Sequence, residues 1–293
     1  MSSLLSFLLK CVSYIPFGVI YVISDCLYYI LYYVVRYRRK VVRKNLTESF
    51  PEKNMQEIKS IEKKFYSYFV DQILETCKLA TISPEEISRR MKFTNAEAVN
   101  AVFRSGKSVA LYMGHYGNWE WVSSIPLCLE KGVKSHQIYH KLSNANVDKL
   151  MLALRERMDS KSVEMRNTAR YVNEQAALRT ICLIGFIADQ SPKKREARYF
   201  LPFLHHQTPV LVGTEKLVKR YGYDAWFLEM KRIRRGYYEA TFVHMHEAPQ
   251  SLPDYELTAI YYRMLEQMIQ ACPELYLWTH KRFKHAKKLE SDC

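Results

Sequence analysis

The sequence predicts an α/β fold: a mostly parallel central sheet flanked by helices, with a membrane-associated helix at the N-terminus. Strand-length apolar runs alternate with helical stretches through the middle of the chain, as is typical of a parallel sheet. Apolar residues make up 48% of the 293 residues, enough for a sizeable core. No linker interrupts the chain, so we expect one large domain over residues 45–293, preceded by a membrane anchor and basic flank over residues 1–44.

The N-terminal apolar run covers residues 11–35 and carries a single charge, Asp25. Its length matches the roughly 20 residues that span a bilayer core, although a buried helix is the alternative interpretation. Six basic residues follow directly, within residues 36–44. Such a stretch favours contact with an anionic leaflet, at about 1 kcal/mol for each cation. It also predicts that the rest of the chain lies on the cytoplasmic side, whether the run spans the bilayer or lies flat.

Helices are predicted next, from periodicity and capping signals. Apolar residues recur every three or four positions over residues 52–79, which indicates an amphipathic helix. Ser83 and Pro84 form an N-cap and first-turn pair. Asn95 is expected to begin a short helix that reaches residue 103.

The middle and end of the chain supply the sheet. Predicted strands cover residues 108–113, 136–139, 181–187, 225–230 and 237–243, the last two joined as a hairpin at Arg235-Gly236. Predicted helices cover residues 118–129, 147–158 and 168–178, and a helix start is expected at Gly213. A last helix over residues 254–271 ends before Pro273.

Charge and cysteine content limit the possible partners. A formal charge of +14 and a pI near 9.3 fit a nucleic acid, an anionic leaflet, or an acidic carrier protein or phosphorylated substrate. The seven cysteines include no C-x-x-C pair. We therefore expect no zinc site, no disulfide framework and no cofactor, and a reducing compartment for the catalytic residues.

The strongest local signal is the segment GHYGNWE, residues 114–120. It follows an apolar strand, so His115 should lie at the carboxyl edge of the sheet, where ligands bind in open α/β folds. Histidine suits removal of a hydroxyl proton at neutral pH. Glu120, five residues later, could orient its ring, and we expect Asn118 to contact substrate. The alternative is a loop histidine bound to backbone groups.

Two further segments carry candidate binding residues. A polar turn after the predicted strand 181–187 should lie at the same sheet edge as His115, with Asp189 and Gln190 suited to a sugar or amide and Lys193 to a phosphate. Arg155 and Arg157 on the predicted helix could clamp a phosphate. An ordinary polar turn and a solvated helix face are the alternatives.

These segments together resemble the lipid A biosynthesis lauroyl/myristoyl acyltransferase family, within the lysophospholipid and glycerolipid acyltransferase superfamily. The GHYGNWE block and the closing element YLWTHKRFK, residues 276–284, are specific in combination. The resemblance covers nearly the whole chain and also takes in Tyr21, Ser24, Asp25, Ala188-Asp189-Gln190 and Thr208-Pro209.

The resemblance implies a glycerolipid acyltransferase-like fold, with His115 as general base and Glu120 as its partner. It further implies that Arg155 or Arg157 binds the acceptor headgroup and that Asp189 has a supporting role. The implied donor is an acyl carrier protein thioester and the implied acceptor a lipid A precursor at the inner membrane.

Two departures from the family pattern bear on the acceptor. Ser191-Pro192 stands where better-known members have an acidic residue after ADQ, and residues 200–208 lack the family's glycine. The alternatives are the same chemistry on another glycolipid, a phospholipid or an amino lipid, or with acyl-CoA as donor. A non-catalytic membrane-surface or nucleic-acid-binding protein is a further alternative, but it leaves the His115–Glu120 block without a purpose, so we expect no nucleic acid partner.

Overall fold

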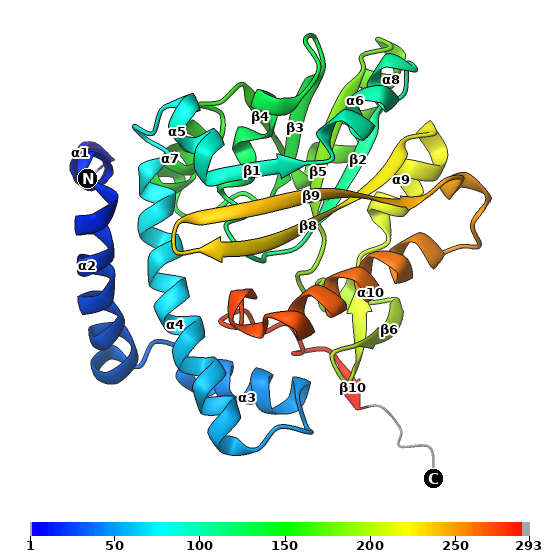
Figure 1. Cartoon of the computed structure of the whole chain (residues 1–293). Coiled ribbons are helices and arrows are strands. Elements are labelled where there is room, and N and C mark those ends of the chain that lie inside the picture. Colours follow the sequence, from blue (N-terminus) through cyan, green and yellow to red (C-terminus); the bar gives the residue numbers. More distant parts are fainter. Residues whose placement is uncertain (1, 289–293) are drawn as a thin grey trace.

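The computed structural model describes residues 2–288 and confirms the α/β class, with a curled seven-stranded sheet between helices (Figure 1). The strand order is β1-β9-β8-β2-β5-β3-β4. Neighbouring strands run parallel except for the hairpin of β8 and β9. The strands are β1 (Met91–Thr94), β2 (Val109–Met113), β3 (Lys134–Tyr139), β4 (Ser160–Glu164), β5 (Cys182–Ile187), β8 (Asp224–Arg234) and β9 (Tyr237–His246).

A second, three-stranded sheet contains β6 (Tyr199–Phe203), β7 (His206–Val210) and β10 (Lys287–Lys288). The sequence did not predict it. Leu204 and His205, at the β6–β7 turn, both have positive φ, 47° and 62°. A glycine would adopt this backbone without strain, so the missing glycine noted in the sequence is a structural cost at this turn. Leu204 nevertheless fills a fully buried position.

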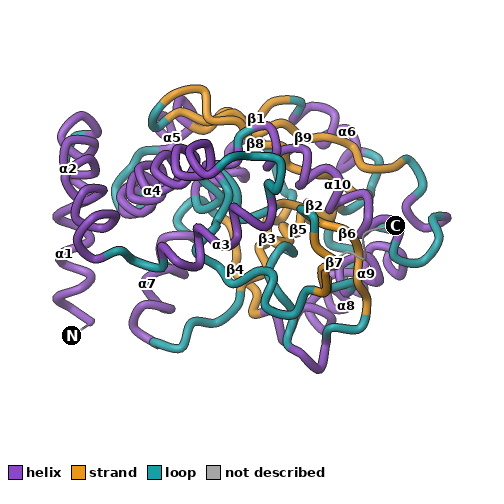
Figure 2. The backbone as a smooth tube through the Cα atoms, turned by 90° about the horizontal axis from the view of Figure 1, so that it is seen from below, coloured by secondary structure: helices purple, strands orange, loops and turns teal. Residues whose placement is uncertain are grey.

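Helices cover both faces of the main sheet (Figure 2). The α-helices that follow the N-terminal segment are α3 (Arg39–Ser49), which packs on α4, then α4 (Met55–Lys78), α5 (Pro84–Arg90), α6 (Ala96–Arg104), α7 (Ala145–Arg155), α8 (Thr168–Ala177), α9 (Gly213–Tyr221) and α10 (Glu256–Ala271). The predicted cap is confirmed, because Ser83 Oγ accepts a hydrogen bond from the Glu86 N–H at 3.2 Å.

The helix expected over residues 118–129 is instead a 3₁₀ helix, Trp121–Cys128. Two serine hydroxyls donate to the carbonyls three residues earlier, Ser123 to Glu120 and Ser124 to Trp121, each at 2.7 Å. Pro126 lies inside the segment and has no N–H to donate. These features favour the tighter turn. Strands β1 and β4 were missed because each is short and only partly apolar.

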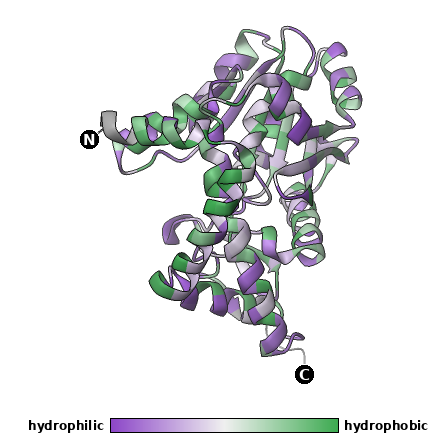
Figure 3. Ribbon diagram, turned by 60° about the vertical axis from the view of Figure 1, so that its left-hand side comes forward, coloured by the Kyte–Doolittle hydropathy of each residue, from purple (hydrophilic) through white to green (hydrophobic). Residues whose placement is uncertain are grey.

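The N-terminal region forms α1 (Ser2–Tyr14), α2 (Phe17–Tyr29) and a π-helical turn (Ile30–Val35), so the apolar run 11–35 begins near the end of α1 and is broken at Pro16. The segment Phe17–Val35 is long and apolar enough to cross a membrane. Most of it is exposed, and its outward apolar side chains include Val19, Val22, Tyr29, Ile30, Val34 and Val35. Figure 3 shows the mainly apolar character of these helices.

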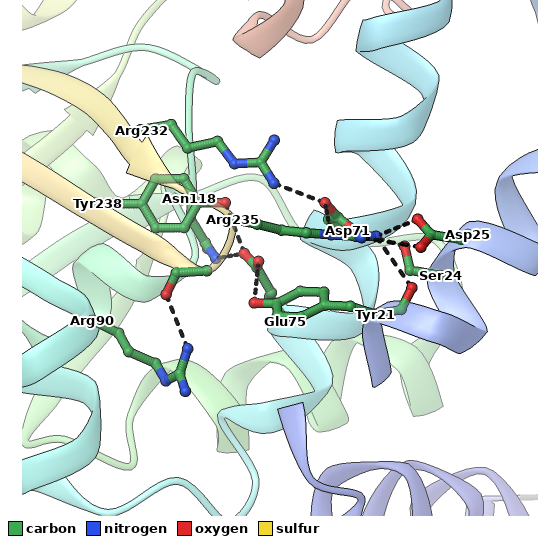
Figure 4. A network of polar contacts seen from close by, with 11 residues as sticks. Tyr21, Ser24, Asp25, Asp71, Glu75, Arg90, Asn118, Arg232, Arg235 and Tyr238 are labelled. Atoms are coloured by element: carbon green, nitrogen blue, oxygen red, sulfur yellow. Dashed lines mark hydrogen bonds and ion pairs between the residues drawn. The ribbon is translucent and has the colours of Figure 1, made fainter. Parts of the chain in front are cut away.

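The polar residues of α2 face α4, where they join a buried ion-pair network (Figure 4). Asp71 of α4 accepts hydrogen bonds from Ser24 Oγ at 2.6 Å and from Arg232 Nη2 at 2.8 Å. Arg235, in the β8–β9 turn, bridges Asp71 and Asp25 with contacts of 2.6 and 2.7 Å. One carboxylate therefore ties the N-terminal helix, α4 and the β8–β9 hairpin together.

Glu75 lies one turn further along α4 and is also fully buried. Its carboxylate accepts hydrogen bonds from the Tyr21 hydroxyl at 3.0 Å and from Asn118 Nδ2 and the Tyr238 hydroxyl, both at 2.8 Å. Its backbone carbonyl accepts from Trp121 Nε1 at 2.9 Å. Burial raises the pKa of Glu75 to about 7.

We predict that Asp71→Asn destabilises the fold by about 3 kcal/mol, because it leaves Arg232 and Arg235 without their buried counter-charge. Thermal unfolding of the detergent-solubilised protein measures the change. The matched control is Glu97→Gln, which removes one member of an exposed ion pair with Arg104 and should leave the unfolding midpoint unchanged. Equal midpoints for the two variants would contradict the prediction.

Candidate active site

The carboxyl edge of the sheet brings two sequence motifs together, as expected. Strands β2 and β5 are parallel neighbours with Met113 paired to Ile187, so His115 and Asp189 each lie two residues beyond a strand end. Gly117 gives the His115 loop its turn. It has a φ of +56°, and a Cβ there would lie 2.3 Å from Met230 Sδ, so a side chain would not fit.

Asp189 holds the His115 ring and also its backbone. The Asp189 Oδ1 atom lies 2.7 Å from His115 Nδ1, and Oδ2 accepts the His115 backbone N–H at 3.1 Å. Asp189 is 2% exposed. Burial opposes its ionisation, but the attraction to His115 and these hydrogen bonds outweigh burial and lower the pKa of Asp189. An ionised Asp189 places the proton of neutral His115 on Nδ1, which leaves Nε2 as a basic lone pair.

The Nε2 atom of His115 faces the polar turn after β5. It lies 3.1 Å from Gln190 Nε2, a contact in which the amide donates to the imidazole lone pair. The Trp119 ring packs edge-on against the imidazole, with ring centroids 5.4 Å apart. Both rings line a pocket, so a hydroxyl that displaces the Gln190 amide would meet a proton acceptor.

The structure places the Glu120 carboxylate against Arg155, and within residues 2–288 it makes no hydrogen bond to His115. The carboxylate is held by Arg155 through two contacts, Nε to Oε2 at 2.7 Å and Nη2 to Oε1 at 2.6 Å. Trp119 Nε1 also donates to Glu120 at 3.2 Å. A bidentate arginine fixes a carboxylate in one direction, and here that direction is toward α7. The carboxylate in contact with the His115 ring is that of Asp189.

The pocket has a volume of about 490 Å³ and extends from His115 over one face of the sheet. Its polar lining residues include His115, Glu120, Arg155, Gln190, Lys193, His280 and Lys284, and the end that holds His115, at the carboxyl ends of β2 and β5, is called its mouth. Its interior is mainly apolar and is lined by residues that include Leu111, Met113, Val122, Ile125, Ile138, Leu183 and Ile187. The shape suits a molecule with a polar reacting end and an apolar chain.

Three predicted substrate-binding residues do not line the pocket: Asp189, which is held against His115, and Asn118 and Arg157, which lie elsewhere. Asn118 is fully buried; its amide donates to Glu75 and its Oδ1 accepts the Trp121 N–H at 3.2 Å. Arg157 donates to the carbonyls of Leu79 and Ile82, just after α4. Neither side chain lines the pocket, because each is engaged in holding backbone or helix positions. Arg155, Gln190 and Lys193 do line it.

Residues of the C-terminal segment hold the turn after β5 in place, which the sequence did not predict. Arg282 is buried and donates to the Tyr262 hydroxyl at 3.0 Å, and that hydroxyl donates to the Ala188 carbonyl at 2.9 Å. His280 Nε2 accepts the Ser191 N–H at 3.4 Å, and burial lowers the pKa of His280 to about 4, which keeps it neutral. The only sequence feature that pointed to these contacts was the closing element YLWTHKRFK, which contains both His280 and Arg282. Within residues 2–288, no group of three or more His, Cys, Asp or Glu side chains could hold a metal ion.

The fold and this site define a class of protein: an α/β enzyme with a His–Asp pair at the mouth of an apolar pocket, beside an apolar N-terminal helix. The model of the family described as "Bacterial lipid A biosynthesis acyltransferase" matches residues 1–285 of the chain. The chain therefore belongs to that family, and it is an acyltransferase. No curated protein gives a significant match to the chain.

We predict that Asp189→Asn lowers kcat by about 10³–10⁴-fold, as expected when the carboxylate that sets a histidine tautomer is lost. Without the neighbouring anion the imidazolium is less favoured, so the acid limb of the pH–rate profile should move to lower pH. Acyl-transfer rates between pH 5 and 9 measure both effects.

Glu120→Gln is the matched carboxylate-to-amide control for this measurement. It releases Arg155 but leaves the Asp189–His115 pair intact, so any loss of rate should come without movement of the acid limb. Movement of the limb in Glu120→Gln and not in Asp189→Asn would overturn the assignment of Asp189 as the orienting residue.

Proposed function

We propose that this acyltransferase moves a fatty acyl chain from an acyl carrier protein thioester to a hydroxyl of a lipid A precursor at the membrane surface. His115 acts as general base and Asp189 orients it. One observation carries the proposal: the basic nitrogen of His115 opens on a pocket whose mouth is polar and cationic and whose interior is apolar. The proposal uses no metal and no cofactor.

The reaction follows from this geometry in one sequence. The acceptor hydroxyl takes the place of the Gln190 amide at His115 Nε2, and the imidazole removes its proton as the oxygen attacks the thioester carbonyl. Asp189 stabilises the imidazolium that forms. The tetrahedral intermediate then collapses, an ester bond forms, the carbon–sulfur bond breaks, and the carrier thiolate leaves with the proton from the imidazolium.

In this proposal Arg155 binds the acceptor and Glu120 holds Arg155 in position. Arg155 Nε and Nη2 are held by Glu120, whereas Nη1 makes no hydrogen bond within residues 2–288. A guanidinium fixed on one edge presents its other edge to a bound anion without losing side-chain freedom. Arg155 and Lys193 both line the pocket, and they would bind the phosphorylated headgroup.

Charge favours an acyl carrier protein as the acyl donor. An acyl carrier protein is strongly acidic, and Lys193 and Lys284 line the pocket mouth while Lys194 and Lys281 are exposed beside them in the chain. The net charge of +14 strengthens attraction to an acidic partner. Acyl-CoA is also anionic, so the donor must be tested by direct comparison of the two thioesters.

The N-terminal helix would seat the enzyme on the inner membrane, with the catalytic domain on its cytoplasmic face. The outward side of Phe17–Val35 is apolar and the basic residues 36–44 follow it. An apolar helix next to a cationic stretch binds anionic bilayers by both burial and attraction. Lipid acceptors would then reach the pocket from the membrane surface.

The test of the proposed function is His115→Ala, which should abolish transfer from acyl carrier protein to a lipid A precursor while the protein stays folded. The matched control is His244→Ala, because His244 forms a similar pair with Asp224, 2.8 Å apart, outside the pocket. Transfer by the folded His115→Ala enzyme would refute the mechanism. Mass spectrometry of lipids from a strain without the protein identifies the acceptor, and an unchanged lipid A would refute that part.

We also predict that a double substitution, Val22→Asp with Val34→Asp, weakens binding to anionic vesicles by about tenfold or more, because charges are costly in an apolar membrane phase. Sedimentation with vesicles containing phosphatidylglycerol measures binding. The control Ile233→Asp changes an equally exposed apolar residue on β8 and should bind normally. Equal binding by both variants would show that α2 is not the membrane contact.

A further inference from the structure

Gly185 occupies an unusual position in the middle of β5 (Cys182–Ile187). It is buried, and it is the one glycine within a β-strand in the part of the chain that the structure describes. Its φ is not in the left-handed region, so the backbone does not require glycine. Glycine inside a strand is less stable than alanine and often marks a site where a ligand approaches closely.

The missing side chain of Gly185 would point into the pocket. Leu183, Gly185 and Ile187 alternate along β5 and all line it. A Cβ built on Gly185 would lie 3.6 Å from the His136 carbonyl oxygen and 4.0 Å from Met113 Sδ, with no other atom within 4 Å. Those are ordinary contacts, so the sheet would accept a methyl group. The space that this methyl would fill is pocket space.

Gly185 lies halfway between the mouth and the floor of the pocket. The lining residues of β5 reach from Ile187, beside the His115 edge, to Leu183, about 13 Å at the usual rise of a strand. Ser135 and Ser160 lie in the same cross-strand row as Leu183. Their hydroxyls are 3.2 Å apart and hydrogen-bonded to each other. Of the rows of β5 that line the pocket, this one lies farthest from His115, and we call it the floor.

We infer that Gly185 determines the length of acyl chain that the enzyme accepts, because its bare backbone keeps the path from His115 to the floor open. This inference rests on the proposed function, in which the donor's acyl chain fills the pocket. A side chain at position 185 would narrow the path halfway along. Acyl chains that end before position 185 would still bind, whereas longer acyl chains would no longer fit in the pocket.

The experiment compares wild type and Gly185→Ala with a series of acyl carrier protein thioesters that differ only in chain length. For Gly185→Ala we expect kcat/KM for the longest accepted donor to fall about tenfold or more relative to the shorter donors, since pockets discriminate single carbon groups on this scale. The melting temperature should not fall. The matched control, Gly213→Ala, adds a methyl into open space outside the pocket and should keep the wild-type profile.

A second variant tests the floor independently. Leu183→Ala deepens the pocket and should shift the preference toward longer chains. An unchanged chain-length profile in folded Gly185→Ala, or a loss equal for all lengths, would overturn the inference while leaving the proposed function intact. If wild type transfers no acyl chain of any length, the proposed function itself fails.

Discussion

Two carboxylates on one helix organise this protein. Asp71 and Glu75 lie four residues apart, on one face of α4, and both are almost wholly buried. A buried carboxylate is costly unless cations or hydrogen-bond donors surround it. Asp71 is matched by two arginines from the β8–β9 hairpin and turn. Glu75 is matched by three neutral donors, and burial raises its pKa to about 7. Elements from three parts of the chain must therefore assemble around α4.

Glu75 also connects the apolar N-terminal helix to the loop that carries His115. Tyr21 of α2 and Asn118 of the loop donate to the two oxygens of Glu75. The loop is held from other sides as well: Tyr68 donates to the Gly117 carbonyl, and the Gly117 N–H donates to Leu275 at 3.0 Å. This density of contacts fixes the backbone on either side of His115, as the general base that we propose would require, since such a group must be placed within a fraction of an ångström to act.

The site separates the tasks of its two carboxylates by their surroundings. Asp189 is enclosed and touches the imidazole, so its charge serves the tautomer of His115. Glu120 lies at the pocket wall against Arg155, so its charge serves the guanidinium. Similar carboxylates thus take different roles because their neighbours differ. The apolar residues that line the rest of the pocket lower the local dielectric constant, which strengthens these electrostatic effects.

Much of this arrangement follows from the sequence. Apolar runs of strand length located β2, β3 and β5, and parallel order then required His115 and Asp189 to meet at one edge of the sheet. The sequence also predicted the cap at Ser83 and the apolar run before the basic residues 36–44. Capping, periodicity and local charge each depend on only a few neighbouring positions. The resemblance carried by GHYGNWE identified the family.

Only the tertiary structure decided which side chains touch. Glu120 is near His115 in sequence, but its carboxylate is held by Arg155 from α7, and the carboxylate that contacts the imidazole is Asp189, beyond the end of another strand. Asn118 turns inward because Glu75, 43 residues earlier, needs a donor. The sequence does not show that Gly185 lines a pocket, because the pocket is formed only when β2, β3 and β5 lie side by side. Local patterns determine where elements begin and end, whereas the direction of a polar side chain depends on charges brought from distant parts of the chain.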